Sequence, residues 1–189
     1  MTARRTYPLV ELDRRVEPHG DPLKGYLVAA NAAVVVIHVL DEGYRLDGYN
    51  AFRRDTVDAL DELAADAPRR AVIEAALRLR RQRPRPPRGL DVTSMRTVLL
   101  TASATHDLVA IHQEQLDAEI CEIGRVRLST ARSYVIDPID PGARWEHPPR
   151  RYRFADVTRV DFGNAYERVL AQVATAWGHP RPSDRPRPR

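Results

Sequence analysis

The sequence predicts an α+β fold in which two small antiparallel β units are linked by two helices and followed by a C-terminal helix. Short apolar stretches separated by turn residues occur before residue 63 and again after residue 105. Between them, apolar residues recur with a helical period, and proline interrupts this pattern at residues 84–88. A third helical pattern follows the second set of strands. With 189 residues, 43% of them apolar, the chain has enough material for a core of this size.

These patterns also predict the boundaries of the parts. The first β unit is expected in residues 1–63, and a helical linker with a Pro/Arg break at 84–88 in residues 64–104. The second β unit and the C-terminal helix are expected in residues 105–177. A Pro/Arg-rich tail in residues 178–189 has little apolar material to bury and is expected to be disordered.

The strands are predicted from short apolar or alternating runs with turn chemistry between them. In the first unit these runs are GYLVAA, AVVVIHVL, YRLDGYNAF and TVDALDE, with Asp47-Gly48 as a turn signal. In the second unit they are DLVAIHQEQL, AEICEIGRVRL, RSYVIDPI, RYRFA and VTRVDF. Each unit is therefore expected to form a small antiparallel sheet.

Two helices are predicted in the linker. Asp66 and Asp91 are placed as N-caps, because an Asp side chain accepts hydrogen bonds from the first amides of a helix. The apolar stripe expected to face the core comprises Val72, Ala76 and Leu79, with Ile73 and Leu77 beside it, in the first helix, and Met95, Val98, Leu99 and Ala102 in the second.

The C-terminal helix has the clearest signals. Asn164 and Glu167 have the spacing of a capping box, and Gly178 stands where a left-handed residue ends a helix. The stripe expected to pack on the sheet comprises Tyr166, Val169, Leu170, Val173 and Trp177.

The two β units match each other in part. Val36-Ile37-His38 corresponds to Ala110-Ile111-His112, with a glycine following each. Phe52 and Asp55 correspond to Phe154 and Asp156. The match indicates an internal repeat, although short β patterns also match by chance.

The residues VVVIHVLDEGYRLDGYNAFRRDTV, together with LVAIHQE, EICEIG and YRFADVTRVDFGNAYERVLAQVA, resemble a family of uncharacterised bacterial proteins with two repeats similar to Sm-like or SH3-like small barrels. The resemblance covers roughly residues 20–176 and implies no established activity. For Sm proteins it implies ring assembly and RNA binding through two loops. The turn LDGYNA lacks the Asp-aromatic-Asn signal of the RNA loop.

The basic charge is concentrated in two segments. Six arginines fall in residues 78–88, and four fall in the last twelve residues. These segments are either solvated linker and tail or contacts to nucleic acid. The candidate nucleic-acid-binding residues in the linker are Arg80, Arg81, Arg83, Arg85 and Arg88.

Two pairs of residues are candidates for chemistry. His38 and His112 have similar places in the repeats and are candidates for a metal site or for proton exchange, against the alternative of half-buried strand histidines. Asp55 and Asp156 are candidates for paired carboxylates, against the alternative that each caps a turn. In both pairs the structural alternative is favoured, and no catalytic residue is assigned.

Other candidates concern partner binding. Trp145, His147 and Arg151 lie in the insertion of the second unit, and Tyr44, Arg45 and Tyr49 flank the Asp-Gly turn; aromatic residues beside arginines are typical of binding loops. For Trp145 the favoured alternative is that it anchors its own loop. Cys121, the single cysteine, is expected to be a small buried hydrophobe.

The sequence has no Gly-rich phosphate loop, no Gly-x-Ser-x-Gly, no His-Glu-x-x-His and no cysteine pair, so no cofactor is expected. One cysteine and the lack of a long apolar run predict a cytoplasmic chain without membrane insertion. The expected function is a non-enzymatic binding or adaptor protein with an unidentified protein partner, and a homo-oligomer is a further option. The alternatives are a nucleic-acid-binding protein and an enzyme with its site between the repeats.

Overall fold

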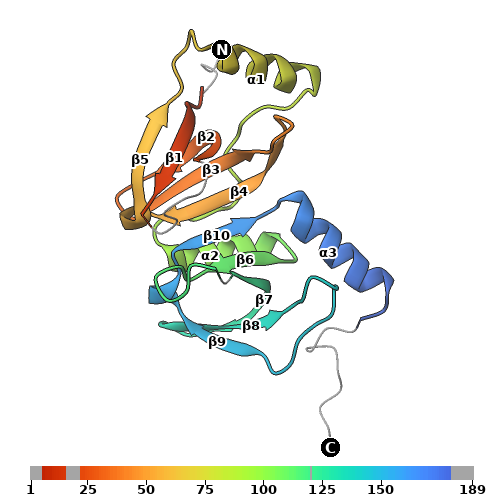
Figure 1. Ribbon diagram of the computed structural model, residues 1–189. Helices are drawn as coiled ribbons and strands as arrows, with labels where there is room; N and C mark the ends of the chain where they lie inside the picture. The colour runs from red at the N-terminus through yellow and green to blue at the C-terminus, as the bar shows by residue number, and fades with distance from the viewer. Residues whose placement is uncertain (1–5, 16–21, 120, 180–189) are drawn as a thin grey trace, which may run out of the picture.

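The computed structural model describes residues 6–15, 22–119 and 121–179, so most of the predicted tail lies outside the described residues. In the described chain, ten strands form one antiparallel sheet in the order β5-β1-β2-β3-β4-β10-β6-β7-β8-β9 (Figure 1). The strands are β1 Leu9–Arg14, β2 Leu23–Ala30, β3 Val34–Leu40, β4 Leu46–Arg53, β5 Val57–Glu62, β6 Val109–His112, β7 Cys121–Ser129, β8 Ser133–Pro138, β9 Arg150–Arg153 and β10 Arg159–Phe162. The helices are α1 Pro68–Leu79, α2 Met95–Thr105 and α3 Ala165–Ala176.

The prediction of two small β units packed together is wrong, because the sheet is continuous through the middle of the molecule. β10 pairs with β4 on one side and with β6 on the other, and the β4 ladder runs from Arg159 opposite Phe52 to Phe162 opposite Tyr49. This pairing satisfies backbone groups that two separate units would leave exposed at their edges. β1, which was missed in the sequence, pairs with both β2 and β5.

The two halves of the sheet nevertheless use the same order of connections. In each half the last strand pairs with the first, and a short 3₁₀ turn precedes the last strand: η1 (Arg54–Thr56) before β5 and η2 (Phe154–Asp156) before β10. Asp55 and Asp156 lie in these two turns. The sequence match of His38 with His112 is wrong, because His38 is in the third strand of its half and His112 in the first.

The main core lies between the sheet and α2. Met95, Val98, Leu99 and Ala102 of α2 are all buried, as predicted from their spacing. The predicted N-cap is wrong: Ser94 caps α2 in a reciprocal capping box with Thr97. Asp91 instead accepts a hydrogen bond from the backbone N–H of Thr93 at 2.8 Å.

α1 lies at the far end of the first half of the sheet (Figure 1). Its N-cap is Ala67, which makes no side-chain capping bond, so the prediction of Asp66 as the cap is wrong. Ile73 and Leu77 are buried, whereas Val72 and Leu79 of the predicted core stripe are exposed. No helix among the described residues is long and apolar enough to cross a membrane.

α3 begins against the start of β4. Asn164 caps the helix as predicted, accepting from the Glu167 N–H at 3.2 Å. Asp47 accepts from the Ala165 N–H at 2.8 Å. The Asn164 backbone lies so close to Gly48 that a Cβ there would stand 2.5 Å from the Asn164 nitrogen. Gly48, at φ +71°, is therefore required for α3 to dock.

Candidate functional site

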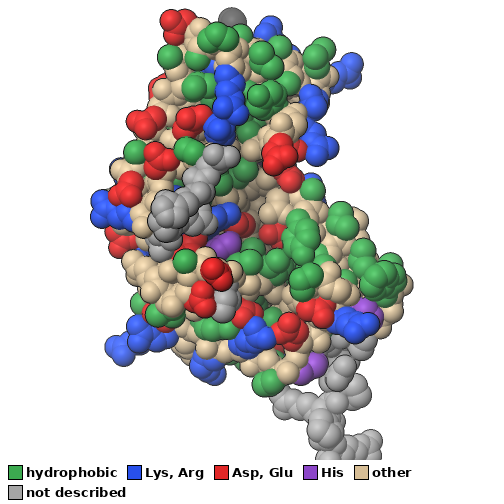
Figure 2. All heavy atoms as spheres, viewed as in Figure 1, with side chains coloured by type: hydrophobic (Ala, Val, Ile, Leu, Met, Phe, Trp, Pro, Cys, Tyr) green, Lys and Arg blue, Asp and Glu red, His purple; other side chains and the backbone are tan. Residues whose placement is uncertain are grey.

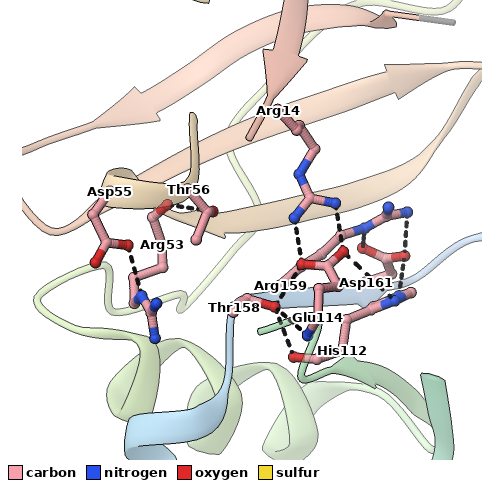
Figure 3. A network of polar contacts seen from close by, with 9 residues as sticks. All are labelled: Arg14, Arg53, Asp55, Thr56, His112, Glu114, Thr158, Arg159 and Asp161. Atoms are coloured by element: carbon pink, nitrogen blue, oxygen red, sulfur yellow. Dashed lines mark hydrogen bonds and ion pairs between the residues drawn. The ribbon is translucent and has the colours of Figure 1, made fainter. Parts of the chain in front are cut away.

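A buried polar network joins the two halves of the sheet (Figure 3). Arg14, the last residue of β1, pairs through both guanidinium nitrogens with the two carboxylate oxygens of Glu114, which follows β6. The two side chains are only 4% and 1% exposed. The Arg14 guanidinium also lies 4.9 Å from the centre of the Phe52 ring. Two residues one hundred positions apart in the chain are thus held together by a bidentate ion pair.

Thr158 fixes the Glu114 carboxylate from the other side. Its hydroxyl donates to Glu114 Oε2 at 2.5 Å and accepts from the Glu114 backbone N–H at 3.2 Å. Burial alone would raise the pKa of Glu114, but the hydrogen bonds from Arg14 and Thr158 and the Arg14 charge hold it below its usual value. Glu114 is therefore an ionised carboxylate inside the protein.

Asp161 of β10 is the second buried carboxylate of the network. Arg159 donates to it from Nε and Nη2, both at 2.7 Å. His112 Nε2 lies 3.1 Å away, and because a carboxylate only accepts, this nitrogen carries the proton. Burial would raise the pKa of Asp161, but the Arg159 charge and the His112 hydrogen bond outweigh it and lower the pKa.

Among the described residues, the carboxylates of the network are fully engaged by donors. Two arginines face two carboxylates, and every oxygen of Glu114 and Asp161 has a donor. A general base needs an oxygen that can reach a substrate proton. Neither carboxylate offers one in this arrangement, so the network acts as a connection between β1, β6 and β10.

Sequence reasoning identified His112 but missed the other members of this network. No local motif marks them, because the partners come from three strands that are distant in the chain. One signal was available. In the stretch RVDF, alternation places Arg159 and Asp161 on one face of β10 and the apolar Val160 and Phe162 on the other.

Glu167 of α3 is a buried acid of a different kind. It is almost inaccessible, and its Oε2 has no hydrogen-bond partner in the described part of the protein. Burial raises its pKa to about 7, with the charges of Asp161 and Asp47 adding to the effect. Glu167 is thus largely protonated in weakly acidic solution. The capping-box prediction was half right: Asn164 caps the helix, but the Glu167 side chain turns into the interior.

A cavity of about 570 Å³ opens between the end of α2 and α3. His106, Glu167, Arg168 and Gln172 contribute to its lining. Burial, and then the Arg168 charge, lower the pKa of His106. The unpartnered Oε2 of Glu167 is shielded from solvent, so it does not present itself to a molecule in this cavity.

His38 and His112, the predicted metal candidates, have separate surroundings. His38 is buried in β3 and stacks on Tyr49 with 4.4 Å between ring centres. Burial lowers its pKa to about 4, and the Arg85 charge adds to this. β4 and β10 lie between the strands of the two histidines. Among the described residues, no three His, Cys, Asp or Glu side chains are placed to hold a metal ion.

The paired-carboxylate candidates each have their own arginine. Asp55 accepts from Arg53 Nε at 2.6 Å, and Asp156 from Arg153 Nη2 at 3.2 Å. Arg53 also donates to the carbonyl of Ala155 at 3.0 Å, which ties turn η1 to turn η2. The turns are neighbours, and their carboxylates are engaged in short-range ion pairs.

The partner-binding candidates lie on distant strands. Tyr44, Arg45 and Tyr49 are at β4 and the turn before it, whereas Arg151 is in β9, with β10, β6, β7 and β8 between. Tyr44, at φ +55°, and Tyr49 pack against the core, and Arg45 pairs with Asp41.

The inserted loop is held against the rest of the protein through Trp145. Trp145 is half-buried and packs beneath α3 in a cluster with Leu170 and Ala174. His147 is exposed. Arg151 is also exposed and donates to the Ser133 hydroxyl at 3.2 Å.

The expectation that Cys121 is buried is wrong. It is an exposed, free cysteine at the start of β7, opposite His112 in the ladder. Partial burial, and then the negative charge of Asp161, raise the pKa of its thiol. This favours the thiol over the reactive thiolate.

The outer face of α3, defined as Tyr166, Val169, Val173 and Trp177, was not predicted as a surface. The sequence places these residues on the sheet, but the apolar residues that α3 buries are Leu170 and Ala174. Val173 is half-buried and packs against the same cluster. Tyr166, Val169 and Trp177 are 51%, 55% and 65% exposed. Figure 2 shows hydrophobic side chains gathered over α3, at the right of the molecule.

Comparisons of the chain with protein-family models, with curated proteins and with solved structures found no match. The resemblance to Sm-like and SH3-like families stays a prediction from the residues.

Proposed function

We propose that the protein is a non-enzymatic binding protein that docks another protein chain on the outer face of α3. The single observation that carries this proposal is the exposed apolar stripe on that helix. Its four residues follow the spacing i, i+3, i+7 and i+11 along the helix. Tyr166, Val169 and Trp177 are exposed, whereas Val173 between them is half-buried. Exposed aromatic residues in such a strip are typical of the anchors that dominate protein interfaces.

The chemistry of the stripe defines the partner. None of its four side chains is charged, and the neighbouring Arg168 is paired with Asp47 at 3.5 Å. The partner therefore presents an apolar surface of its own. A second copy of the chain offers one such surface, because an antiparallel arrangement about a two-fold axis would place Tyr166 against the other copy's Trp177.

The buried groups support binding over catalysis. The carboxylates of Glu114 and Asp161 are saturated with donors, and the unpartnered oxygen of Glu167 is shielded. An enzymatic site at the centre of the sheet would require these groups to exchange their partners for a substrate.

Val169→Asp is expected to weaken partner binding at least tenfold, because it places a charge in the middle of the apolar stripe. Val72→Asp is a matched control, since Val72 is 54% exposed on α1 and Val169 is 55% exposed on α3. Self-association is measured by sedimentation velocity. Binding of other proteins is measured by purifying the tagged chain from the cells that naturally produce it and quantifying the proteins that co-purify.

Loss of self-association or of a defined partner with Val169→Asp, but not with Val72→Asp, is the expected result. Equal behaviour of the wild-type chain and both variants in both measurements would contradict the proposal. Circular dichroism and melting temperature establish that each variant keeps its fold.

A further inference from the structure

The arginine segment, residues 78–88, is a strongly basic surface that the α3 proposal does not use. Its six arginines are all exposed, and in the described part of the protein none of them forms an ion pair with a carboxylate. Some arginines elsewhere do pair with Asp or Glu, among them Arg45, Arg70 and Arg150. Figure 2 shows basic side chains beside the right-hand end of α1, where this segment begins.

The backbone of the segment is anchored to the protein. The N–H of Gln82 donates to the Leu77 carbonyl at 2.9 Å and closes the end of α1. The Gln82 side chain then bonds Leu46 of β4 in both directions, at 3.1 and 3.4 Å. Further on, the Arg85 N–H lies 3.4 Å from His38 Nδ1. The arginines are therefore displayed from a fixed stretch of chain.

Arg81 adopts the left-handed conformation, with φ at +54°. It occupies the position after the helix at which glycine is strongly preferred. A side chain here is strained, and backbone strain of this kind is concentrated at functional positions. Glycine at residue 81 would relieve the strain but remove one positive charge from the centre of the segment.

The spacing of the charges fits a polyanion. Five arginines lie within residues 80–88. After the turn at Arg81, three prolines favour an extended chain at about 3.1 Å per residue, so residues 82–87 span roughly 15 Å. Nucleic acids present phosphates continuously over such a distance, at one charge per ~1.7 Å of duplex axis. The guanidinium group matches phosphate oxygens in a bidentate arrangement. A membrane-binding segment would need an apolar face, and between these arginines there are only prolines, Gln82 and the single Leu79.

We propose that the arginine segment binds the phosphate backbone of nucleic acid without sequence specificity. The aromatic rings nearest to it are not presented for base stacking, since His38 is buried and Tyr49 is sandwiched between His38 and Phe162. Contact is therefore to phosphate, and affinity depends on charge and salt.

Fluorescence anisotropy of a labelled 20-nucleotide single-stranded RNA and a 20-base-pair duplex DNA, with the full chain and a salt series, tests the proposal. The variant Arg80→Gln/Arg83→Gln/Arg88→Gln removes three charges from exposed side chains. The control Arg125→Gln/Arg132→Gln/Arg144→Gln removes three charges from exposed arginines elsewhere. The segment variant is expected to lose at least tenfold in affinity, with the slope of log K against log salt reduced by about 2.

The control variant is expected to change affinity less than twofold. Equal losses of affinity in the two variants would show that binding depends on net charge alone, and would overturn the proposal. So would micromolar binding that the segment variant retains, flat salt dependence, or no binding by the wild-type chain at 50 mM salt. Displacement of the nucleic acid by polyglutamate at equal charge would assign the surface to an acidic protein instead.

Arg81→Gly gives a second, independent readout. Because glycine adopts positive φ without strain, the melting temperature is expected to rise by about 2–4 °C. Affinity for either nucleic acid is expected to fall about two- to fivefold, whereas Arg81→Gln lowers affinity equally without the gain in stability. Unchanged affinity in both variants would show that Arg81 does not contact the nucleic acid, and would contradict the proposed surface.

Discussion

Glu114→Gln is expected to lower the free energy of unfolding by about 3–5 kcal/mol, the range for breaking a buried ion pair by removing one partner. Arg14 would keep its burial and lose the negative charge of the carboxylate that its two terminal guanidinium nitrogens contact. Urea denaturation at pH 7, followed by circular dichroism, measures the change.

The neighbouring pair provides the control. Arg15 and Asp58 form an ion pair whose side chains are 65% and 47% exposed, so Asp58→Asn is expected to cost less than about 1 kcal/mol. Arg14→Met/Glu114→Leu, which removes both charges, is expected to recover most of the loss. A Glu114→Gln variant as stable as Asp58→Asn would show that the network does not hold the two halves together.

Glu167→Gln is expected to stabilise the protein at pH 8 and to have little effect at pH 4. The folded pKa of about 7 lies above the ordinary 4.5, so the native state keeps a proton that the unfolded chain releases. The stability linked to this proton is fully present below pH ~4.5 and is lost as pH rises through about 7. Glutamine cannot ionise. At pH 8 the free energy of unfolding of the Glu167→Gln variant is therefore expected to exceed that of the wild-type protein by on the order of 3 kcal/mol.

Unfolding free energies of both proteins between pH 4 and pH 8 test this expectation. The difference between them should grow with pH and level off above pH ~7. Glu42→Gln replaces an exposed acid and should give a nearly constant difference. A constant difference for Glu167→Gln as well would contradict a buried, protonated Glu167.

Local patterns predicted the elements well where one periodicity dominates. The α2 stripe of Met95, Val98, Leu99 and Ala102 is buried as expected, because these four residues lie on one face of the helix. Asn164 caps α3 because capping depends on a side chain and an amide three residues away. Such interactions involve residues only a few positions apart and can therefore be predicted from the sequence.

The faces of α1 and α3 could not be predicted in the same way. Apolar residues cover a broad arc of both helices, so more than one stripe satisfies the helical period. The sheet selects Ile73 and Leu77 from α1, and Leu170 and Ala174 from α3. The remaining apolar residues, including Val169 and Trp177, are left at the surface.

The pairing of strands distant in the chain was the other feature that could not be predicted from the sequence. The ladder between β4 and β10 and the network of Arg14, Glu114 and Asp161 join residues about one hundred positions apart. The local spacing of apolar residues does not indicate which strand edges pair with each other. The short β1 was missed because its run LVELDR has few apolar residues, although Leu9, Val10 and Leu12 are buried.

Photo-crosslinking in the native cell tests the docking role of α3 most directly. A photoreactive phenylalanine is introduced at position 169, and, as the matched control, at position 72, which is equally exposed on α1. The proposal predicts discrete protein adducts from position 169 that are absent from position 72. A lack of adducts from position 169, or the same adducts from both positions, would contradict it.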